Sequence, residues 1–208
     1  MALAEARPFL IGAAVLLGAC LWLGWWILSA FAALLLAGLL LFFRDPHRQP
    51  PPDPLALVSP ADGKVICVDE AEDPCFGQGK FRRVGIFLSV LDVHVNRSPC
   101  DARVEKTHYS AGEFLDARHL EVDLRNENQT WLLTSPRGPV LVRQIAGLIA
   151  RRIVAWKKTG EAVRRGERIG MIRFGSRTDL YVPTACAIRV QVGQRVKGGE
   201  TVLASWPA

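Results

Sequence analysis

The chain carries the decapeptide Gly160-Glu161-Ala162-Val163-Arg164-Arg165-Gly166-Glu167-Arg168-Ile169 and, later in the chain, a related one, Gly193-Gln194-Arg195-Val196-Lys197-Gly198-Gly199-Glu200-Thr201-Val202. Both copies place glycine, valine, glycine, glutamate and an aliphatic residue at the same offsets. The pattern predicts a turn, one inward aliphatic side chain, a second turn through glycine, and entry into a strand. Two copies are too few for a solenoid, so we expect two rigid β-turn units within one domain.

Residues 55–208 otherwise show short apolar runs bounded by turns, without a long amphipathic helical period. Such spacing is typical of an all-β sandwich or barrel. The decapeptides resemble the hammerhead turns of biotinyl and lipoyl carrier domains. We therefore expect a mainly β fold: a compact β-sandwich or barrel-like domain with carrier-like hammerhead turns. The predicted strands are 55–58, 64–68, 81–90, 103–109, 119–124, 129–134, 140–145 and 148–156, with a hairpin turn at 135–138.

The N-terminal segment differs from the rest of the chain in composition, because no charged residue lies between Pro8 and Phe43. One continuous helix there would be about 54 Å long, well beyond the bilayer core of about 30 Å. Trp22, Trp25 and Trp26 lie in the middle, and tryptophan prefers the membrane interface. This predicts an apolar helical hairpin with limbs at 8–23 and 27–43. Each limb is too short to span the bilayer core at its usual thickness, so the limbs must thin the bilayer or dip into it. A hairpin buried in a soluble protein would normally show a polar face.

The predicted domains are a membrane-anchoring segment (1–43), a proline-rich linker (44–54) and a β domain (55–208). Only Arg7 of the 26 Lys and Arg, and only Glu5 of the 20 acidic residues, precede residue 44, which leaves 25 minus 19, or +6, on the remainder. A basic domain beside a bilayer suits an anionic membrane surface, and Arg44 and Arg48 place it on the cytoplasmic side of a cell (inner) membrane. The chain has no basic run, aromatic RNA-binding signature or zinc spacing, so nucleic acid is not expected.

The five cysteines are odd in number and follow no spacing pattern. This favours reduced thiols in a protein facing the cytosol over a disulfide framework or a metal site. No metal is expected. The cysteines are Cys20, Cys67, Cys75, Cys100 and Cys186.

The peptide Gly175-Ser176 lies between the two decapeptides and is flanked by Arg173 and Arg177. A glycine carbonyl is uncrowded, and in a bent backbone the following hydroxyl can attack it and convert the amide into an ester. The simpler interpretation is a loop in which the glycine takes an unusual φ and the serine caps a turn. The dipeptide alone does not decide between them.

Two further residues are candidates for proton transfer. Asp62 lies in the turn Ser59-Pro60-Ala61-Asp62-Gly63, where it either accepts a proton or orients a base, or belongs to ordinary turn chemistry. His94 follows the apolar run 81–90 and precedes a polar stretch that ends at Pro99, which favours a position facing a pocket. A purely structural histidine is the alternative.

Taken together, these motifs resemble the phosphatidylserine decarboxylase family, most closely its short, membrane-anchored bacterial form. The shared elements run in order over nearly the whole chain, and each is weak alone. They are the apolar N-terminus ending in Phe42-Phe43-Arg44-Asp45-Pro46, the turn Ser59-Pro60-Ala61-Asp62-Gly63, the segment Asp92-Val93-His94-Val95-Asn96-Arg97, and Arg173-Phe174-Gly175-Ser176.

The resemblance implies a proenzyme that cleaves itself between Gly175 and Ser176 into a β chain (1–175) and an α chain (176–208), which remain together as a heterodimer. Dimers of that unit are common in the family, and nothing in this sequence requires one. Ser176 becomes a covalent pyruvoyl group, whose ketone forms a Schiff base with the serine amine of phosphatidylserine. The products are phosphatidylethanolamine and CO2.

The resemblance assigns Asp62 to self-cleavage and His94 to decarboxylation as proton donor. Longer forms of the family carry a second histidine three residues after the first, where this chain has Arg97. Arginine stays protonated and is not a general base. Three arrangements stay open: His94 serves both steps, Asp62 acts directly, or Arg97 stabilises the oxyanion or binds a substrate anion. We favour His94 in both steps with an electrostatic role for Arg97.

Two other interpretations compete with this one. A membrane-anchored, non-enzymatic carrier or adaptor-like β domain is suggested by the hammerhead turns, but Lys197 is offset from the tip that carries the prosthetic group in carriers. A serine hydrolase using Ser176 with His94 lacks the Gly-x-Ser-x-Gly elbow.

Overall fold

A computed structural model describes residues 2–72, 79–119, 125–148, 152–173 and 176–207. The chain divides into two compact units, Met1–Pro46 and His47–Ala208. Each is described by itself below.

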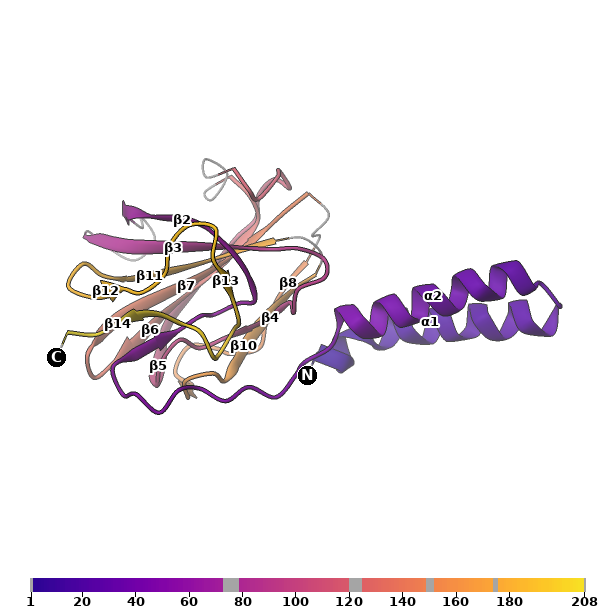
Figure 1. Cartoon of the computed structure of the whole chain (residues 1–208), viewed down its shortest axis with the longest axis horizontal. Coiled ribbons are helices and arrows are strands. Elements are labelled where there is room, and N and C mark those ends of the chain that lie inside the picture. Colours follow the sequence, from indigo (N-terminus) through magenta and orange to yellow (C-terminus); the bar gives the residue numbers. More distant parts are fainter. Residues whose placement is uncertain (1, 73–78, 120–124, 149–151, 174–175, 208) are drawn as a thin grey trace. The chain divides into compact units, whose positions relative to one another are not determined.

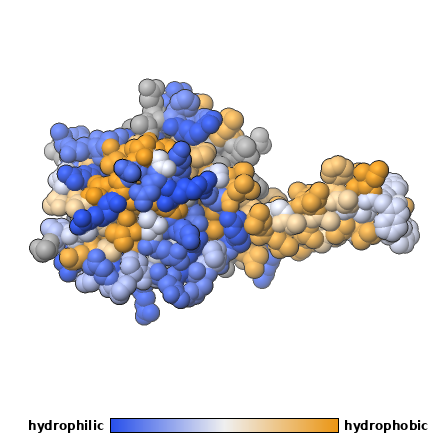
Figure 2. All heavy atoms as spheres, in the orientation of Figure 1, coloured by the Kyte–Doolittle hydropathy of each residue, from blue (hydrophilic) through white to orange (hydrophobic). Residues whose placement is uncertain are grey.

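The first unit is an apolar helical hairpin, as predicted (Figure 1). Helices α1 (Ala2–Trp22) and α2 (Trp26–Phe42) are joined by a turn in which Gly24 has a φ of 70°. The first limb begins earlier than predicted, because the helix also includes Glu5 and Arg7. The body of the hairpin is coloured hydrophobic in Figure 2, whereas its far end is pale. Helix α1 is long and apolar enough to cross a membrane.

The second unit is mainly β, as predicted, and its largest sheet is curled into a half-barrel. That sheet has eight strands in the order β13-β2-β3-β11-β7-β6-β5-β9, and two three-stranded sheets have the orders β1-β14-β12 and β4-β10-β8 (Figure 1). The strands are β1 (Ala56–Val58), β2 (Gly63–Glu72), β3 (Lys80–Leu88), β4 (Val95–Arg97), β5 (Ala102–Ser110), β6 (Asn128–Ser135), β7 (Gly138–Ala146), β8 (Arg152–Ala155), β9 (Ala162–Val163), β10 (Arg168–Arg173), β11 (Ser176–Pro183), β12 (Ala187–Ile188), β13 (Arg195–Val196) and β14 (Val202–Ser205).

Most predicted strands are confirmed, including the hairpin of β6 and β7 around residues 135–138. The predicted strand at 119–124 has only His119 within the described residues, where it lies in a bend. The predicted strand at 148–156 is shorter in the structure. Leu148 lies in a bend, residues 149–151 are outside the described residues, and β8 covers Arg152–Ala155.

The second unit is built from two equivalent halves, since the order of the eight-stranded sheet is symmetric about its centre. Strands β1, β2, β3, β11, β12, β13 and β14 of the first half correspond to β4, β5, β6, β7, β8, β9 and β10 of the second. Even the irregularities recur. The β2–β3 register shifts between Val65 and Cys67, and the β5–β6 register shifts at the equivalent positions, between Val104 and Lys106.

The decapeptides are the most visible part of this duplication, and their predicted turns are present in both copies. Gly160 and Gly193 have φ values of 91° and 94°, and Gly166 and Gly199 both have a φ of 79°. Such values favour glycine, because a Cβ is strained there. The sequence repeat thus reports two copies of one backbone conformation.

The second half is continuous, from β4 to β10, and is inserted into the first half between β3 and β11. Leu88 at the end of β3 pairs directly with Ser176 at the start of β11. Both ends of the insertion therefore lie at one end of the large sheet. The segment with His94 belongs to the first end and Ser176 to the second, which brings together residues far apart in the sequence.

Candidate active site

Ser176 is the first residue of β11 and lies between Leu88 of β3 and Ala146 of β7. The residue is completely buried, and its Oγ has no hydrogen-bond partner within the part of the chain that the structure describes. Buried hydroxyl groups usually have a hydrogen-bond partner, so a buried hydroxyl without one is a candidate for a catalytic role. Gly175, the other half of the predicted cleavage bond, lies outside the described residues.

His94 is also fully buried, in the connection between β3 and β4. Its Nδ1 lies 2.9 Å from the carbonyl oxygen of Asp92. A carbonyl can only accept, so Nδ1 carries the proton and the lone pair of the neutral ring is on Nε2. The His94 carbonyl accepts a bond of 3.3 Å from the N–H of Ile172, which lies shortly before Ser176 in the chain. The fold thus brings His94 to the β10–β11 junction.

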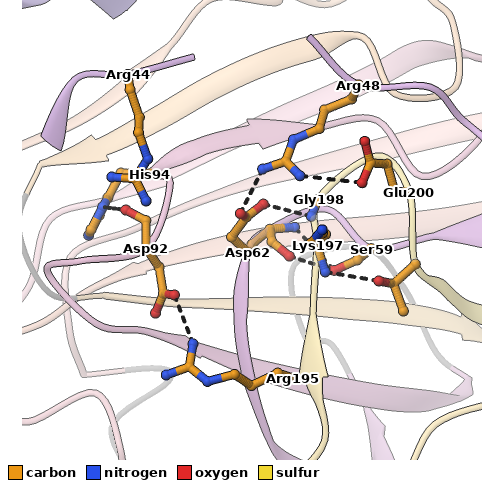
Figure 3. A network of polar contacts seen from close by, with 12 residues as sticks. Arg44, Arg48, Ser59, Asp62, Asp92, His94, Arg195, Lys197, Gly198 and Glu200 are labelled. Atoms are coloured by element: carbon orange, nitrogen blue, oxygen red, sulfur yellow. Dashed lines mark hydrogen bonds and ion pairs between the residues drawn. The ribbon is translucent and has the colours of Figure 1, made fainter. Parts of the chain in front are cut away.

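Asp62 precedes β2 and binds two partners (Figure 3). Its Oδ1 accepts the N–H of Gly198 at 2.8 Å, and its Oδ2 lies 2.7 Å from Nη2 of Arg48, which also contacts Glu200. Burial raises the pKa of this carboxyl, although the bonds from Gly198 and Arg48 lower it. The carboxylate therefore ties the segment at Arg48 to the second decapeptide.

The start of β2 lies at the same end of the sheet as Ser176, because Lys64 pairs with Phe87, and Phe87 pairs with Arg177. Two strand spacings amount to about 10 Å. The three residues predicted for catalysis, Asp62, His94 and Ser176, thus gather at one sheet end, with Asp62 two strands away from β11.

Arg97 lies in β4 and is almost completely buried. Its Nη1 donates to the carbonyl oxygen of Gly166 at 3.0 Å, and a Cβ on Gly199 would lie 3.0 Å from its Cδ. Its guanidinium therefore packs where the glycine turns of the two decapeptides meet. The electrostatic role suggested for Arg97 stays a prediction.

Asn96, Gln144 and Thr178 form a buried polar cluster that the sequence analysis missed. Asn96 donates to Thr178 Oγ1 at 3.1 Å, and Gln144 donates to Asn96 Oδ1. Thr178 lies two residues after Ser176 on β11, so the two side chains share one side of that strand. Asn96 lies two residues after His94, which directly precedes β4. This spacing was the available signal.

Arg177 and Asp179 form a bidentate ion pair on the opposite face of β11, with both Nε and Nη2 of the arginine 2.6 Å from the carboxylate oxygens. Neither side chain is exposed. Burial lowers the pKa of Arg177, but the charge of Asp179 and the hydrogen bonds to its carboxylate together raise it above the usual value, so the guanidinium stays protonated. The residue after Ser176 is thereby held rigidly in the sheet.

Cys20, Cys67, Cys100 and Cys186 are free thiols, and Cys75 lies outside the described residues. Burial raises the pKa of Cys67 to about 11 and that of Cys100 to about 12. These two thiols are therefore poor nucleophiles at neutral pH. Within the described ranges, no three His, Cys, Asp or Glu side chains are grouped as metal ligands.

The comparisons with known proteins agree with one another. A family model described as phosphatidylserine decarboxylase matches residues 35–204. A phosphatidylserine decarboxylase proenzyme of Desulfotalea psychrophila is 45% identical over 85% of this chain and 83% of its own length. Proteins of the same name from Geotalea daltonii and Citrifermentans bemidjiense are 42% and 41% identical, over 96% and 98% of this chain and 93% and 95% of theirs. The chain therefore belongs to the phosphatidylserine decarboxylase family.

Proposed function

We propose that this enzyme decarboxylates phosphatidylserine to phosphatidylethanolamine and CO2, using a pyruvoyl group made from its own Ser176. Family membership supports the reaction, and the relatives' name, proenzyme, supports maturation by cleavage. The single structural observation that carries the proposal is the buried hydroxyl of Ser176, which has no hydrogen-bond partner among the described residues and lies at the start of β11, directly after the inserted half. Membership of an enzyme family removes the support for the non-enzymatic carrier interpretation.

Self-cleavage begins when Ser176 Oγ attacks the Gly175 carbonyl carbon, so that the amide C–N bond breaks and an ester forms. Loss of the Ser176 Cα proton then expels the Gly175 carboxylate, which breaks the bond between Cβ and Oγ of Ser176 and leaves a dehydroalanine. Water then replaces the amine nitrogen, which leaves as ammonia. The expected products are chains 1–175 and 176–208, which remain together as a heterodimer because β11 is hydrogen-bonded to β3 and β7.

The residues around Ser176 fit a pyruvoyl group, because its neighbours Leu88 and Ala146 are apolar and fully buried. When present, the ketone supplies an electron sink for the electrons left by the departing carboxylate. Apolar, buried surroundings also favour loss of a charged carboxylate as neutral CO2.

We assign the proton transfers to His94. Its Nδ1–H bond to Asp92 leaves Nε2 to accept the hydroxyl proton during cleavage and to deliver a proton to the substrate Cα later. Asp62, bound to Arg48 and Gly198, supports the cleavage geometry from the start of β2, two strands away from β11. Arg97 contributes positive charge near the site.

The hairpin of α1 and α2 anchors the enzyme in a cell (inner) membrane, and the basic second unit faces the cytoplasm and its anionic lipids. The substrate is itself a lipid of that surface. This arrangement keeps the soluble unit next to its substrate, which never has to leave the bilayer completely.

Intact mass spectrometry under denaturing conditions tests the proposal. The wild-type chain should give two masses that correspond to cleavage after Gly175, with the smaller about 17 Da below a fragment that begins with serine, because a ketone replaces the amine. Ser176→Ala should stay whole, and Ser110→Ala, on β5 and separated from β11 by β6 and β7, should be cleaved like wild type. A single full-length mass in an active preparation would exclude the pyruvoyl mechanism.

A further inference from the structure

Asn96 is the centre of a buried hydrogen-bonded cluster beside Ser176. Its Nδ2 donates to the carbonyl oxygen of Pro60 at 3.3 Å and to Thr178 Oγ1 at 3.1 Å, and its Oδ1 accepts from Gln144 Nε2. Asn96, Gln144 and Thr178 are all completely buried. Gly170, opposite Asn96 on β10, makes room for them, since a Cβ there would lie 3.2 Å from Gln144 Nε2.

The directions of these bonds follow from Pro60. Its carbonyl oxygen can only accept, so the Asn96 atom facing it is the NH2 group. The Asn96 oxygen then faces Gln144, which must present its own NH2 group. This leaves Gln144 Oε1 buried, without a hydrogen-bond partner among the described residues.

Asn96 connects its own segment with the segments of Pro60 and Thr178, and each of these three segments carries one predicted catalytic residue. In each case the connecting residue lies two positions from the catalytic one. Pro60 is two residues before Asp62, and Thr178 is two residues after Ser176. Asn96 itself is two residues after His94. One amide side chain therefore sets the spacing of all three segments.

The pairing registers relate each residue of one half to its equivalent in the other. Lys64 pairs with Phe87 as Arg103 pairs with Thr134, so β2 is aligned with β5 and β3 with β6. The next residue of β3, Leu88, pairs with Ser176, and its equivalent, Ser135, pairs with Gly138. Ser176 of β11 therefore corresponds to Gly138 of β7.

The equivalent positions in the other half show what the fold needs where the polar cluster lies. Strand β1 pairs with β14 in the same register as β4 pairs with β10, with Leu57 opposite Ala204 and Asn96 opposite Gly170. The equivalents of Asn96, Gln144 and Thr178 are therefore Leu57, Val182 and Val140, in that order. All three equivalents are fully buried members of one apolar core cluster. The same backbone arrangement is therefore stable with aliphatic side chains at each position.

The polar cluster is the more costly choice for folding. It includes an open acceptor, Gln144 Oε1, and a buried acceptor without a partner costs about 1–3 kcal/mol. The aliphatic equivalents avoid this cost. Folding alone does not account for a polar cluster here.

We propose that Asn96, together with Gln144 and Thr178, is a positioning group for self-cleavage that holds the segments of Asp62, His94 and Ser176 in register. This inference rests on the proposed function. It assigns no proton transfer to the three residues. They act by keeping the Ser176 hydroxyl in the geometry for attack, where an error of about 1 Å reduces a rate by about 100-fold.

The test replaces the polar cluster with the residues of the equivalent half. The full chain with Asn96→Leu, Gln144→Val and Thr178→Val is made by cell-free synthesis with lipid vesicles, and the appearance of chain 176–208 is followed by gel. We expect cleavage about 100-fold slower than wild type, with a thermal unfolding midpoint at or above that of the uncleaved Ser176→Ala chain. A folded triple variant that cleaves at the wild-type rate overturns the inference.

A gentler pair of variants covers the case in which the triple variant does not fold. Thr178→Val has nearly the same shape as threonine but does not accept the Asn96 bond, whereas Thr178→Ser keeps the hydroxyl. Cleavage should be slow in the first and close to wild type in the second. Equal rates in both variants overturn the inference.

Gln129→Met is the matched control. Gln129 is a buried amide on β6 that pairs with Gln144 on β7, and the one hydrogen bond described for its side chain goes to the carbonyl of Thr130. It should cleave like wild type. An uncut wild-type chain would overturn the proposed function and this inference with it. Slow cleavage in Gln129→Met equal to that of the triple variant would overturn the inference alone, since any lost buried amide would then have the same effect.

Discussion

At the scale of single residues, Asp62 and Asp101 are equivalent carboxylates in the two halves. Asp62 Oδ1 accepts the N–H of Gly198 at 2.8 Å, and Asp101 Oδ1 accepts the N–H of Arg165, the equivalent turn position, at 2.9 Å. The bond to the turn is thus a property of the fold. What distinguishes Asp62 is its ion pair with Arg48.

Asp62 should make the stability of the domain depend on pH. Burial raises its pKa in the folded state, despite the opposing bonds from Gly198 and Arg48, so the native state binds the proton more tightly than the unfolded chain does. Its contribution to the unfolding free energy therefore increases as the pH falls through the raised pKa. Wild type should gain stability relative to Asp62→Asn between about pH 7 and about pH 4, because the gain is complete only near the ordinary carboxyl pKa of 3.8.

Denaturant unfolding of the two detergent-solubilised chains at both pH values measures this difference. Both chains carry Ser176→Ala, so that cleavage does not alter the comparison. A difference that shrinks on acidification would show that the bonds from Gly198 and Arg48 outweigh burial.

At the scale of elements, the start of β2 depends on close contact with β3. Gly63 has a φ of 152°, and a Cβ there would lie 2.2 Å from the carbonyl oxygen of Phe87. Only glycine therefore permits the turn after Asp62 to join the sheet at this distance. The motif Ser59–Gly63 therefore ends in glycine because the backbone of β3 lies too close for any side chain at this position.

Gly63→Ala should destabilise the domain by about 1–3 kcal/mol more than Gly79→Ala does. Gly79 is a matched control, because its φ of 153° imposes the same backbone strain while no atom of the described residues lies within 4 Å of its Cβ position. Thermal unfolding of both variants separates strain from the clash with Phe87. Equal losses would mean that β2 and β3 move apart without penalty.

At the scale of the whole molecule, the second unit carries its own core. The principal apolar cluster, which includes Leu57, Val84, Trp131 and Leu180, lies entirely within residues 47–208. The helices instead expose many large apolar side chains, among them Trp22 and Trp26 at 86% and 75%. Each unit thus suits a different solvent.

A chain without residues 2–43 should therefore fold, leave the membrane fraction and still cleave itself, whereas the full chain should sediment with membranes. Circular dichroism and fractionation measure the two properties. The full chain with Leu16→Ala and Leu34→Ala is a milder control, because neither helix is shortened. This variant should still sediment with membranes. A truncated chain that aggregates without β structure would contradict the independence of the core.

Local patterns predicted the elements whose causes are local. The charge-free N-terminal run predicted the hairpin, turn residues predicted β6 and β7, and the glycines of the decapeptides predicted their turns. The family resemblance supplied Ser176, His94 and Asp62 before any geometry was known. The predictions of the hairpin, of β6 and β7 and of the turns are confirmed, because each depends on a short stretch of chain. The roles of Ser176, His94 and Asp62 stay predictions.

Tertiary structure alone decided which distant segments meet. The insertion of one half into the other places Leu88 against Ser176, and Asn96 reaches Thr178 across 82 positions of sequence and Gln144 across 48. The alternation of side chains along a strand does not predict such pairings, because they follow from the order of strands in the sheet. The sequence by itself determined the type of each local element and pointed to Ser176 as the candidate serine. Strand order and register decided what surrounds Ser176, because hydrogen bonds between strands join residues that lie far apart in the chain.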